Sequence, residues 1–202
     1  LDFQNENTPA IIIPDLHARP IFLLNILNYK LNINNENISV YSALAKNKLK
    51  IICVGDALHS ECATGDRWIC AQNEIDEGNF EGESIVSEMT EGFALLCGIM
   101  KLKILFPANF HFLKGNHENI LNRTGSGDYS FRKYANEGHT VMEFVKHYYG
   151  EDILFLMNCV EDELPLIAVS KGVVVSHAEP KMVYSRQQLI NARNEPINGA
   201  TA

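Results

Sequence analysis

Short runs of apolar residues alternate along this chain with longer segments of helical periodicity. Continuous apolar runs, typical of strands buried on both faces, predict strands at 10–14, 49–54 and 109–114. Two later runs predict a hairpin formed by 164–169 and 172–176. Apolar residues at helical spacing predict helices that begin at Pro20, cover 83–105 and cover 139–149. Strands that alternate with helices predict an α/β fold.

The segments between these elements are polar and rich in residues that favour turns. The longest, 60–82, is predicted to be a loop inserted beside the second strand, with Trp68 and Ile69 as its apolar anchors. A loop in that place usually helps to shape a pocket. A turn is predicted at 32–37 and a loop at 119–130, and after Pro180 the pattern fades. No internal repeat is present, and the chain is predicted to be one domain over 1–202.

Metal-binding residue types follow four of the apolar runs. They occur in the strings Asp15-Leu16-His17, Gly55-Asp56, Gly115-Asn116-His117-Glu118 and Ser176-His177-Ala178. Taken singly, an Asp or His at a strand end is more often a helix cap or a turn former. Ligands of α/β folds, however, gather at the carboxyl ends of the strands. The repetition therefore favours a shared metal site over four separate turns.

These side chains make a mixed oxygen and nitrogen site, which suits Mn, Fe, Zn or Co and lacks the thiolates of a structural zinc site. Asp15 and His17 are two residues apart, so they can point the same way and hold one ion. Asp56 is placed to bridge to a second ion, which Asn116 and His177 could hold. Two such cations activate a water molecule and clamp the oxygens of an in-line displacement, which is the chemistry of phosphoester hydrolysis.

Two further roles follow from that chemistry. His117 stands next to Asn116 and should point elsewhere, so it is free to protonate the leaving oxygen as a general acid. Dispersed arginines would neutralise the phosphate charge. The most useful signals are thus one candidate catalytic residue, His117, and five candidate metal ligands.

Composition narrows the possible partners and compartments. The formal net charge of −8 argues against a nucleic-acid surface and suits a protein that gathers divalent cations. No apolar run approaches the roughly 20 residues that span a bilayer. The five cysteines form no Cys-x-x-Cys pair, and a Cys62–Cys70 disulfide is disfavoured, so a reducing, cytoplasmic location is predicted. Because the chain begins at Leu1, the sequence leaves a removed leader open.

The four strings resemble the motifs of the calcineurin-like metallophosphoesterases, particularly the phosphoprotein phosphatase branch. The strings resemble that family's Gly-Asp-x-His-Gly, Gly-Asp-x-x-Asp-Arg-Gly, Gly-Asn-His-Glu and His-Gly motifs in the same order, and Leu164-Pro165-Leu166 resembles its Leu-Pro-Leu. The resemblance runs over about 10–180. It implies an α/β/β/α sandwich with two divalent metal ions, Mn above all, between its sheets. It also implies the same roles for the five ligands and for His117, with a phosphorylated protein or small phosphoester as substrate.

The chain departs from the family pattern in three places. His59-Ser60 stands where the family has Asp-Arg, whose Asp orients the catalytic His and whose Arg holds phosphate. Candidates for these roles are Glu61, Arg67, Arg19 and Arg123. His59 itself is equally compatible with a pocket residue that touches phosphate and with a plain loop residue, and Arg67 beside Trp68 fits loop packing somewhat better than phosphate binding. The long 60–82 segment is the second departure. The third is that no His follows His177, so the family's last ligand is expected beyond Ala202, in a missing C-terminal part of the domain.

Three functions remain in competition at this point. The leading one is a metal-dependent phosphoesterase, protein Ser/Thr phosphatase-like, that uses metal-activated water. A nucleotide or dinucleoside polyphosphate hydrolase is the alternative enzyme. The change at His59-Ser60 and the absent last His favour instead a non-catalytic scaffold of the same fold, whereas the intact set of ligand residues disfavours it.

Overall fold

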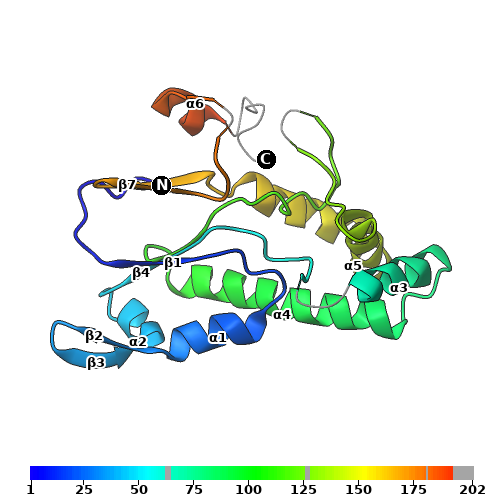
Figure 1. Ribbon diagram of the computed structural model, residues 1–202, viewed down its shortest axis with the longest axis horizontal. Helices are drawn as coiled ribbons and strands as arrows, with labels where there is room; N and C mark the ends of the chain where they lie inside the picture. Colours follow the sequence, from blue (N-terminus) through cyan, green and yellow to red (C-terminus); the bar gives the residue numbers. More distant parts are fainter. Residues whose placement is uncertain (62–64, 126–127, 181, 193–202) are drawn as a thin grey trace.

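A three-stranded parallel sheet forms the centre of a mixed α/β structure. The computed structural model describes residues 1–61, 65–125, 128–180 and 182–192 (Figure 1). The strands are β1 (Ala10–Ile13), β2 (Lys30–Ile33), β3 (Glu36–Ser39), β4 (Lys50–Cys53), β5 (Phe110–Phe112), β6 (Ile167–Ser170) and β7 (Val173–Ser176). The helices are α1 (Pro20–Asn28), α2 (Val40–Ala45), α3 (Gly65–Asp76), α4 (Glu83–Leu105), α5 (Glu137–Asp162) and α6 (Arg186–Asn191).

The order of strands in the parallel sheet is β1-β4-β5, so the second predicted strand lies in the middle. Ile51 of β4 pairs with Ile11 of β1 and with Phe110 of β5. All of β4 and β5 is buried, as their continuous apolar runs predict. The prediction is wrong for β1, which is an edge strand with Ile12 48% exposed. Because the three strands are parallel neighbours, their carboxyl ends lie side by side.

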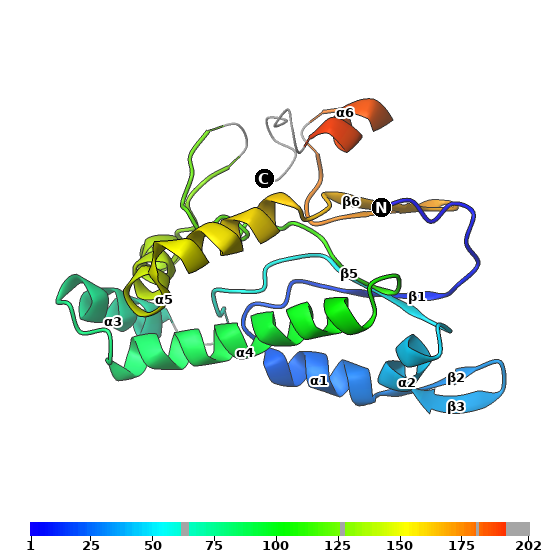
Figure 2. The ribbon, with the colours of Figure 1, turned by 180° about the vertical axis from the view of Figure 1, so that it is seen from behind.

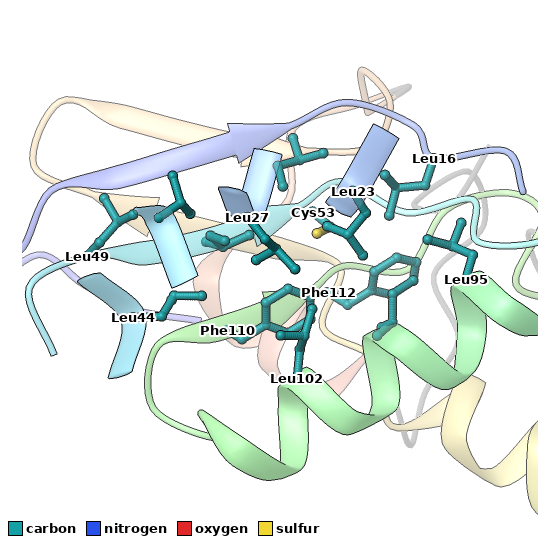
Figure 3. Packing of buried hydrophobic residues seen from close by; sticks show 14 of the residues in the cluster. Leu16, Leu23, Leu27, Leu44, Leu49, Cys53, Leu95, Leu102, Phe110 and Phe112 are labelled. Carbon is teal, nitrogen blue, oxygen red and sulfur yellow. The ribbon is translucent and has the colours of Figure 1, made fainter. Parts of the chain in front are cut away.

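Helices cover one face of this sheet and a hairpin covers the other. In both views α1 and α4 lie on one side, while the β6–β7 hairpin and α5 lie on the other (Figures 1 and 2). Leu23 and Leu27 from α1, Leu95 and Leu102 from α4, and Cys53 from β4 meet in the main hydrophobic core (Figure 3). A smaller cluster joins the sheet to the hairpin through Ile52, Leu113 and Ala168. The parallel sheet is thus packed between helices on one face and the hairpin on the other, which fits the predicted α/β fold.

The predicted loop over 60–82 is wrong, because 65–76 forms the helix α3. Its apolar face is Trp68, Ala71 and Ile75, which are buried against α4 and α5, whereas the predicted anchor Ile69 is 47% exposed. Spacings of three and four residues place these side chains on one helix face. That face is easily missed among the many Asn, Asp and Glu residues around it. Cys62 lies outside the described residues, so the Cys62–Cys70 pairing is not tested.

Other boundaries also differ from the prediction. The turn over 32–37 narrows to Asn34 and Asn35, with φ 52° and 64°, inside a β2–β3 hairpin that leads into α2. The third predicted helix extends over all of α5, which is interrupted at Gly150 (φ 80°). After Pro180, where the sequence pattern fades and predicts no element, the structure forms the short helix α6. The predicted loop over 119–130 contains no helix or strand among its described residues, 119–125 and 128–130. Residues 126–127 lie outside the described part of the chain. In the described part of the chain, none of the helices is long and apolar enough to cross a membrane.

A buried carboxyl near the end of α5 supports the loop after β5. Glu161 accepts a hydrogen bond from the Ile120 N–H at 2.8 Å. Burial nevertheless raises the pKa of Glu161 to about 8. In the unfolded chain this carboxyl ionises near pH 4.3, so folding takes up a proton between about pH 4.3 and 8. Within that window its contribution to stability falls as the pH rises.

We predict that Glu161→Gln removes this pH dependence, because the neutral amide still accepts the Ile120 N–H bond. The free energy of unfolding of the wild type should lose roughly 1.4 kcal/mol per pH unit relative to the variant between about pH 5 and 8. Urea unfolding at several pH values measures this difference. Glu151→Gln, an exposed change on the same helix, should follow the wild type. Parallel curves for wild type and Glu161→Gln would show that Glu161 is ionised in the folded protein.

Candidate metal centre

The loops that follow β1 and β4 are joined directly by backbone hydrogen bonds. The N–H of His17 donates to the carbonyl of Asp56 at 2.7 Å, and that of Ala18 donates to Ala57 at 3.0 Å. Parallel strands end at the same edge of a sheet, so the two loops run side by side. Asp15, His17 and Asp56 are thereby brought together, as the sequence predicts.

The carboxylate of Glu118 fastens the loop after β5 to the loop after β4. It accepts hydrogen bonds from the N–H groups of Asp56, Ala57 and Gly115 at 2.9, 2.9 and 2.7 Å. Gly115 must be a glycine, because a Cβ there would lie 2.1 Å from Oδ1 of Asp56. The last residue of the Gly-Asn-His-Glu string therefore positions the site, a role that sequence reasoning missed.

Several residues of these loops have left-handed backbone conformations. His17, Ala18, Asp56 and His59 have φ of 41°, 51°, 58° and 62°, although none is a glycine. Such conformations are uncommon for residues with a side chain and are held in place by the surrounding structure. Here the hydrogen bonds between loops supply that constraint. Three of these four residues, His17, Asp56 and His59, are ones that the sequence assigns to metal binding or to the pocket.

Three imidazoles surround the buried carboxylate of Asp56. Its Oδ2 lies 3.8 Å from Nε2 of His17, 3.7 Å from Nε2 of His117 and 3.6 Å from Nε2 of His177. A direct hydrogen bond would need about 2.7–3.2 Å. Two ligands of one ion, each about 2.0–2.2 Å from it, lie no more than about 4.4 Å apart. For the candidate ligands His17 and His177, the spacing therefore fits cations shared with Asp56 better than a hydrogen-bonded network.

His177 reaches this group from the end of β7. Its Nδ1 lies 3.2 Å from the carbonyl of Val54, and its Nε2 lies 2.7 Å from Oδ1 of Asn116. An Nε2–H would donate a hydrogen bond to Asn116. In the tautomer that donates from Nδ1 to Val54, the lone pair of Nε2 instead faces Asn116, and a cation bound to both could satisfy the two atoms. Asn116 and His177 are thus together, as predicted, and His177 adjoins Asp56.

Asp15 completes the group on its more exposed side. Its Oδ2 lies 3.9 Å from Nε2 of His17, and its Oδ1 lies 3.4 Å from Nδ1 of His177. Asp15, His17 and Asp56 offer ligand atoms that all lie within 4.8 Å of one another. The five residues predicted as metal ligands therefore meet in one place, and their donor set fits a divalent transition ion.

Burial controls the charge of the groups at this centre. Burial, followed by the neighbouring Glu118 charge, raises the pKa of the Asp56 carboxyl to about 8. Burial, followed by the neighbouring imidazoles of His59 and His17, lowers the pKa of His117 to about 2. Burial also lowers the pKa of His17. Neutral imidazoles keep the lone pair that a metal ion requires.

His59 and Phe131 pack around His117. The ring of His59 lies 5.1 Å from that of His117 and is almost fully buried, and the ring of Phe131 lies 3.5 Å from His117. Among the described residues, neither nitrogen of His59 has a hydrogen-bond partner, nor does Nδ1 of His117. His59 therefore adjoins the candidate catalytic residue but offers it no carboxylate. Its burial disfavours a direct contact with phosphate.

The predicted phosphate-binding arginines are all engaged elsewhere. Arg67 pairs with Glu88 and, at 2.8 Å, with Glu91. Arg123 pairs with Asp162 at 2.5 Å. The guanidinium of Arg19 donates to the backbone carbonyls of Leu16 and Asp15. Arg19 thus supports the loop of Asp15, and the ion pairs of Arg67 and Arg123 give no support to a phosphate-binding role.

A cavity of about 340 Å³ adjoins Asn116 and is lined by positively charged side chains that sequence reasoning missed. Its lining includes Lys114, Tyr129, Phe131 and Arg132. Arg132 is exposed, and no carboxylate of the described chain pairs with it within ion-pair distance. Nothing in the local sequence distinguished Arg132 from other surface arginines. Only the fold places it beside a candidate metal ligand.

No protein-family model and no curated protein matches the sequence. One solved structure to which the chain is similar is a protein serine/threonine phosphatase from Saccharomyces cerevisiae with similarity to human phosphatase PP5. The match has 21% sequence identity and a TM-score of 0.48, and it covers 89% of this chain and 42% of that one. Values this low do not assign the chain to a family, and the chain spans less than half the length of that protein.

Asp56 is the candidate ligand expected to contact both ions, the one of Asp15 and His17 and the one of Asn116 and His177. We therefore predict that Asp56→Asn abolishes the stabilisation of the folded chain by Mn²⁺. At a concentration of 100 times its Kd, a bound ion should raise the Tm of the wild type by roughly 5–10 °C. Asp152→Asn, an exposed change on α5, should keep the whole shift. Thermal denaturation with and without Mn²⁺ measures both. A full shift in Asp56→Asn would place the bound ion somewhere else.

Proposed function

We propose that this chain is a metal-dependent phosphoesterase that hydrolyses phosphomonoesters, with phosphorylated proteins as the leading substrate class. The observation that carries the proposal is the spacing around Asp56, whose carboxylate lies 3.6–3.8 Å from three imidazoles. The motif strings, above all Gly115-Asn116-His117-Glu118 and Leu164-Pro165-Leu166, favour the protein phosphatase class. A metallophosphoesterase-type sandwich is the corresponding proposal for the fold.

Five side chains would hold two divalent cations, of which Mn is the first candidate. Asp15 and His17 would hold one, Asn116 and His177 the other, and Asp56 would touch both. When bound, the cations supply Lewis acidity and an activated water for attack on phosphorus. The chain supplies their position, because the loop-to-loop hydrogen bonds fix the ligands before an ion arrives. Such preorganisation avoids reorganisation during the reaction.

The cavity beside Asn116 is the proposed site of the substrate. A phosphate group there would meet Lys114 and Arg132, and the exposed Tyr129 would contact the group that carries the phosphate. Lys114 is held by Asp128 at 3.7 Å, whereas Arg132 is free to pair with an anion. Arg132 therefore takes the phosphate-binding role for which Arg19, Arg67 and Arg123 are poorly placed.

We keep His117 as the proton donor to the leaving oxygen, a role in which the negative charge of a bound phosphate would raise the pKa that burial lowers. Its Nε2 faces Oδ2 of Asp56, so it lies beside the place where the phosphorus would react. The missing orienting carboxylate, replaced by His59, favours the non-catalytic scaffold as a second candidate function. Both candidate functions, the phosphoesterase and the scaffold, expect bound cations, but only the phosphoesterase expects turnover of a substrate.

Phosphate release in the presence of Mn²⁺ separates the candidates. The proposal expects Mn-stimulated hydrolysis of p-nitrophenyl phosphate and of phosphoserine or phosphothreonine peptides. Faster release from dinucleoside polyphosphates would favour the alternative enzyme. Binding of Mn²⁺ without turnover of any of the three would support the scaffold and contradict the proposed activity.

We predict that His117→Ala lowers kcat by about 10²–10⁴, the usual contribution of general acid catalysis, without loss of bound Mn²⁺. His139→Ala, on α5, should retain wild-type kcat. Steady-state kinetics and the Mn²⁺-dependent Tm shift should be measured on the same preparations. Unchanged kcat in His117→Ala would remove its role as proton donor, whereas a lost Tm shift would make it a metal ligand.

A further inference from the structure

A second group of possible metal ligands lies beside the centre and shares one imidazole with it. His17, Glu61 and His117 each offer one ligand atom, and these atoms all lie within 4.8 Å of one another. Oε2 of Glu61 lies 3.8 Å from Nε2 of His17, which is too long for a hydrogen bond and close enough for two ligands of one ion. Asp15 and Asp56 form a different group with His17. Two three-ligand positions therefore meet at one histidine.

Both imidazoles of the second group are buried. His17 is 9% exposed and His117 is 5% exposed. Among the described residues, Nδ1 of each ring has no hydrogen-bond partner. The two rings lie 4.9 Å apart between centroids, so they border the same small space. A buried polar nitrogen without a partner is costly, and a bound cation is one way to satisfy such a ring.

The carboxylate of Glu61 is held in a fixed orientation toward this space. Its Oε1 lies 2.7 Å from Nζ of Lys133, while its Oε2 faces His17. Carboxylates that bind metal ions are commonly oriented by an outer partner of this kind. The side chain is 28% exposed, so an ion can reach it from solvent.

The two groups differ in the ion that their donor atoms favour. Asp15, His17 and Asp56 give two carboxylates and one imidazole, which suits Mn²⁺. The group of Glu61 gives two imidazoles and one carboxylate, a set that binds Zn²⁺ with a fourth position open. Nitrogen ligands also favour Zn²⁺ over Mn²⁺ in affinity. The second group is therefore better suited to zinc than the first.

The two positions cannot be filled at the same time. Nε2 of His17 is the atom that faces Asp15, Asp56 and Glu61, at 3.9, 3.8 and 3.8 Å. A neutral imidazole nitrogen has one lone pair and binds one ion. An ion held by Glu61 and His117 thus removes His17 from the position of Asp15 and Asp56.

We propose that His17, Glu61 and His117 form an inhibitory Zn²⁺ site that competes with Mn²⁺ for His17. The site itself rests on these three side chains alone, whereas its inhibitory effect rests on the proposed function. A nitrogen of His117 that binds Zn²⁺ has no free lone pair, so the ring no longer exchanges a proton there with the leaving oxygen. Zinc would therefore act on the proton donor and on one Mn²⁺ ligand together.

Isothermal titration of the metal-free chain with Zn²⁺ and, separately, with Mn²⁺ tests the site. Glu61→Gln and His117→Ala should each weaken the same Zn²⁺ binding event at least about tenfold, because changes even in outer partners of metal ligands cost about 10–100-fold. Glu61→Gln should change Mn²⁺ affinity no more than about threefold, because for that position it removes only a neighbouring charge. Asp15→Asn should show the reverse pattern and weaken Mn²⁺ more than this Zn²⁺ event.

Glu151→Gln is the matched control, because Glu151 forms a 2.7 Å ion pair with Lys146 on the exposed side of α5. It should bind both ions as the wild type does. Wild-type Zn²⁺ affinity in Glu61→Gln would overturn the site. Equal weakening of Zn²⁺ and Mn²⁺ in Glu61→Gln, or the same loss in Glu151→Gln, would also overturn it.

Phosphate release in Mn²⁺ tests the inhibitory effect separately. Added Zn²⁺ should stop hydrolysis of p-nitrophenyl phosphate by the wild type, and Glu61→Gln should need at least about tenfold more Zn²⁺ for the same inhibition. Equal sensitivity of the two proteins to Zn²⁺ would contradict the inhibitory role. A chain without turnover that loses the Zn²⁺ event in both variants would contradict the proposed function and the inhibition, and would leave the zinc site standing.

Discussion

The structure depends on how one buried carboxylate, Asp56, is accommodated. Only 2% of Asp56 is exposed, and three imidazole nitrogens face its Oδ2 without reaching hydrogen-bond distance. Burial of a carboxylate is costly unless it is neutralised or paired. Without a cation, the centre responds by raising the pKa of Asp56 to about 8. A divalent ion removes the same cost while it satisfies the imidazoles, and this gives the site its proposed chemistry.

Neighbouring groups hold Asp56 in place at a considerable local cost. Its own backbone, like that of His17 and His59, is left-handed, and Gly115 leaves just enough room for its carboxylate. Glu118 offsets this cost by accepting three N–H groups from the loops that carry the candidate ligands. Strain of this kind persists where the surrounding structure over-determines it, typically at functional sites. The glycine and the final acid of Gly-Asn-His-Glu therefore serve the site as much as its polar residues do.

The sequence predicted those parts of the structure that are encoded by residues adjacent in the chain. The apolar runs of β4 and β5 and the metal-binding residues that follow them are contiguous, so they could be found without a fold. The helix α3 was missed because its apolar face, Trp68, Ala71 and Ile75, is sparse within a polar segment. The ion pair of Arg67 with Glu88, the position of Arg132 and the approach of Glu61 to His17 each join distant segments. No spacing rule predicts such contacts, which only the packed helices and loops create.

The side chains around His117 and His17 decide which groups can contact the proposed cations. His59 packs an aromatic ring against His117, and Glu61, two residues later, brings a carboxylate oxygen within 3.8 Å of the His17 imidazole. Anomalous diffraction from a crystal loaded with Mn²⁺ tests the central claim most directly. The account predicts two manganese peaks about 3.5–4 Å apart, each within about 2.0–2.3 Å of a carboxylate oxygen of Asp56. A crystal in which Asp56 forms a direct hydrogen bond to an imidazole, with no manganese beside it, would contradict the account.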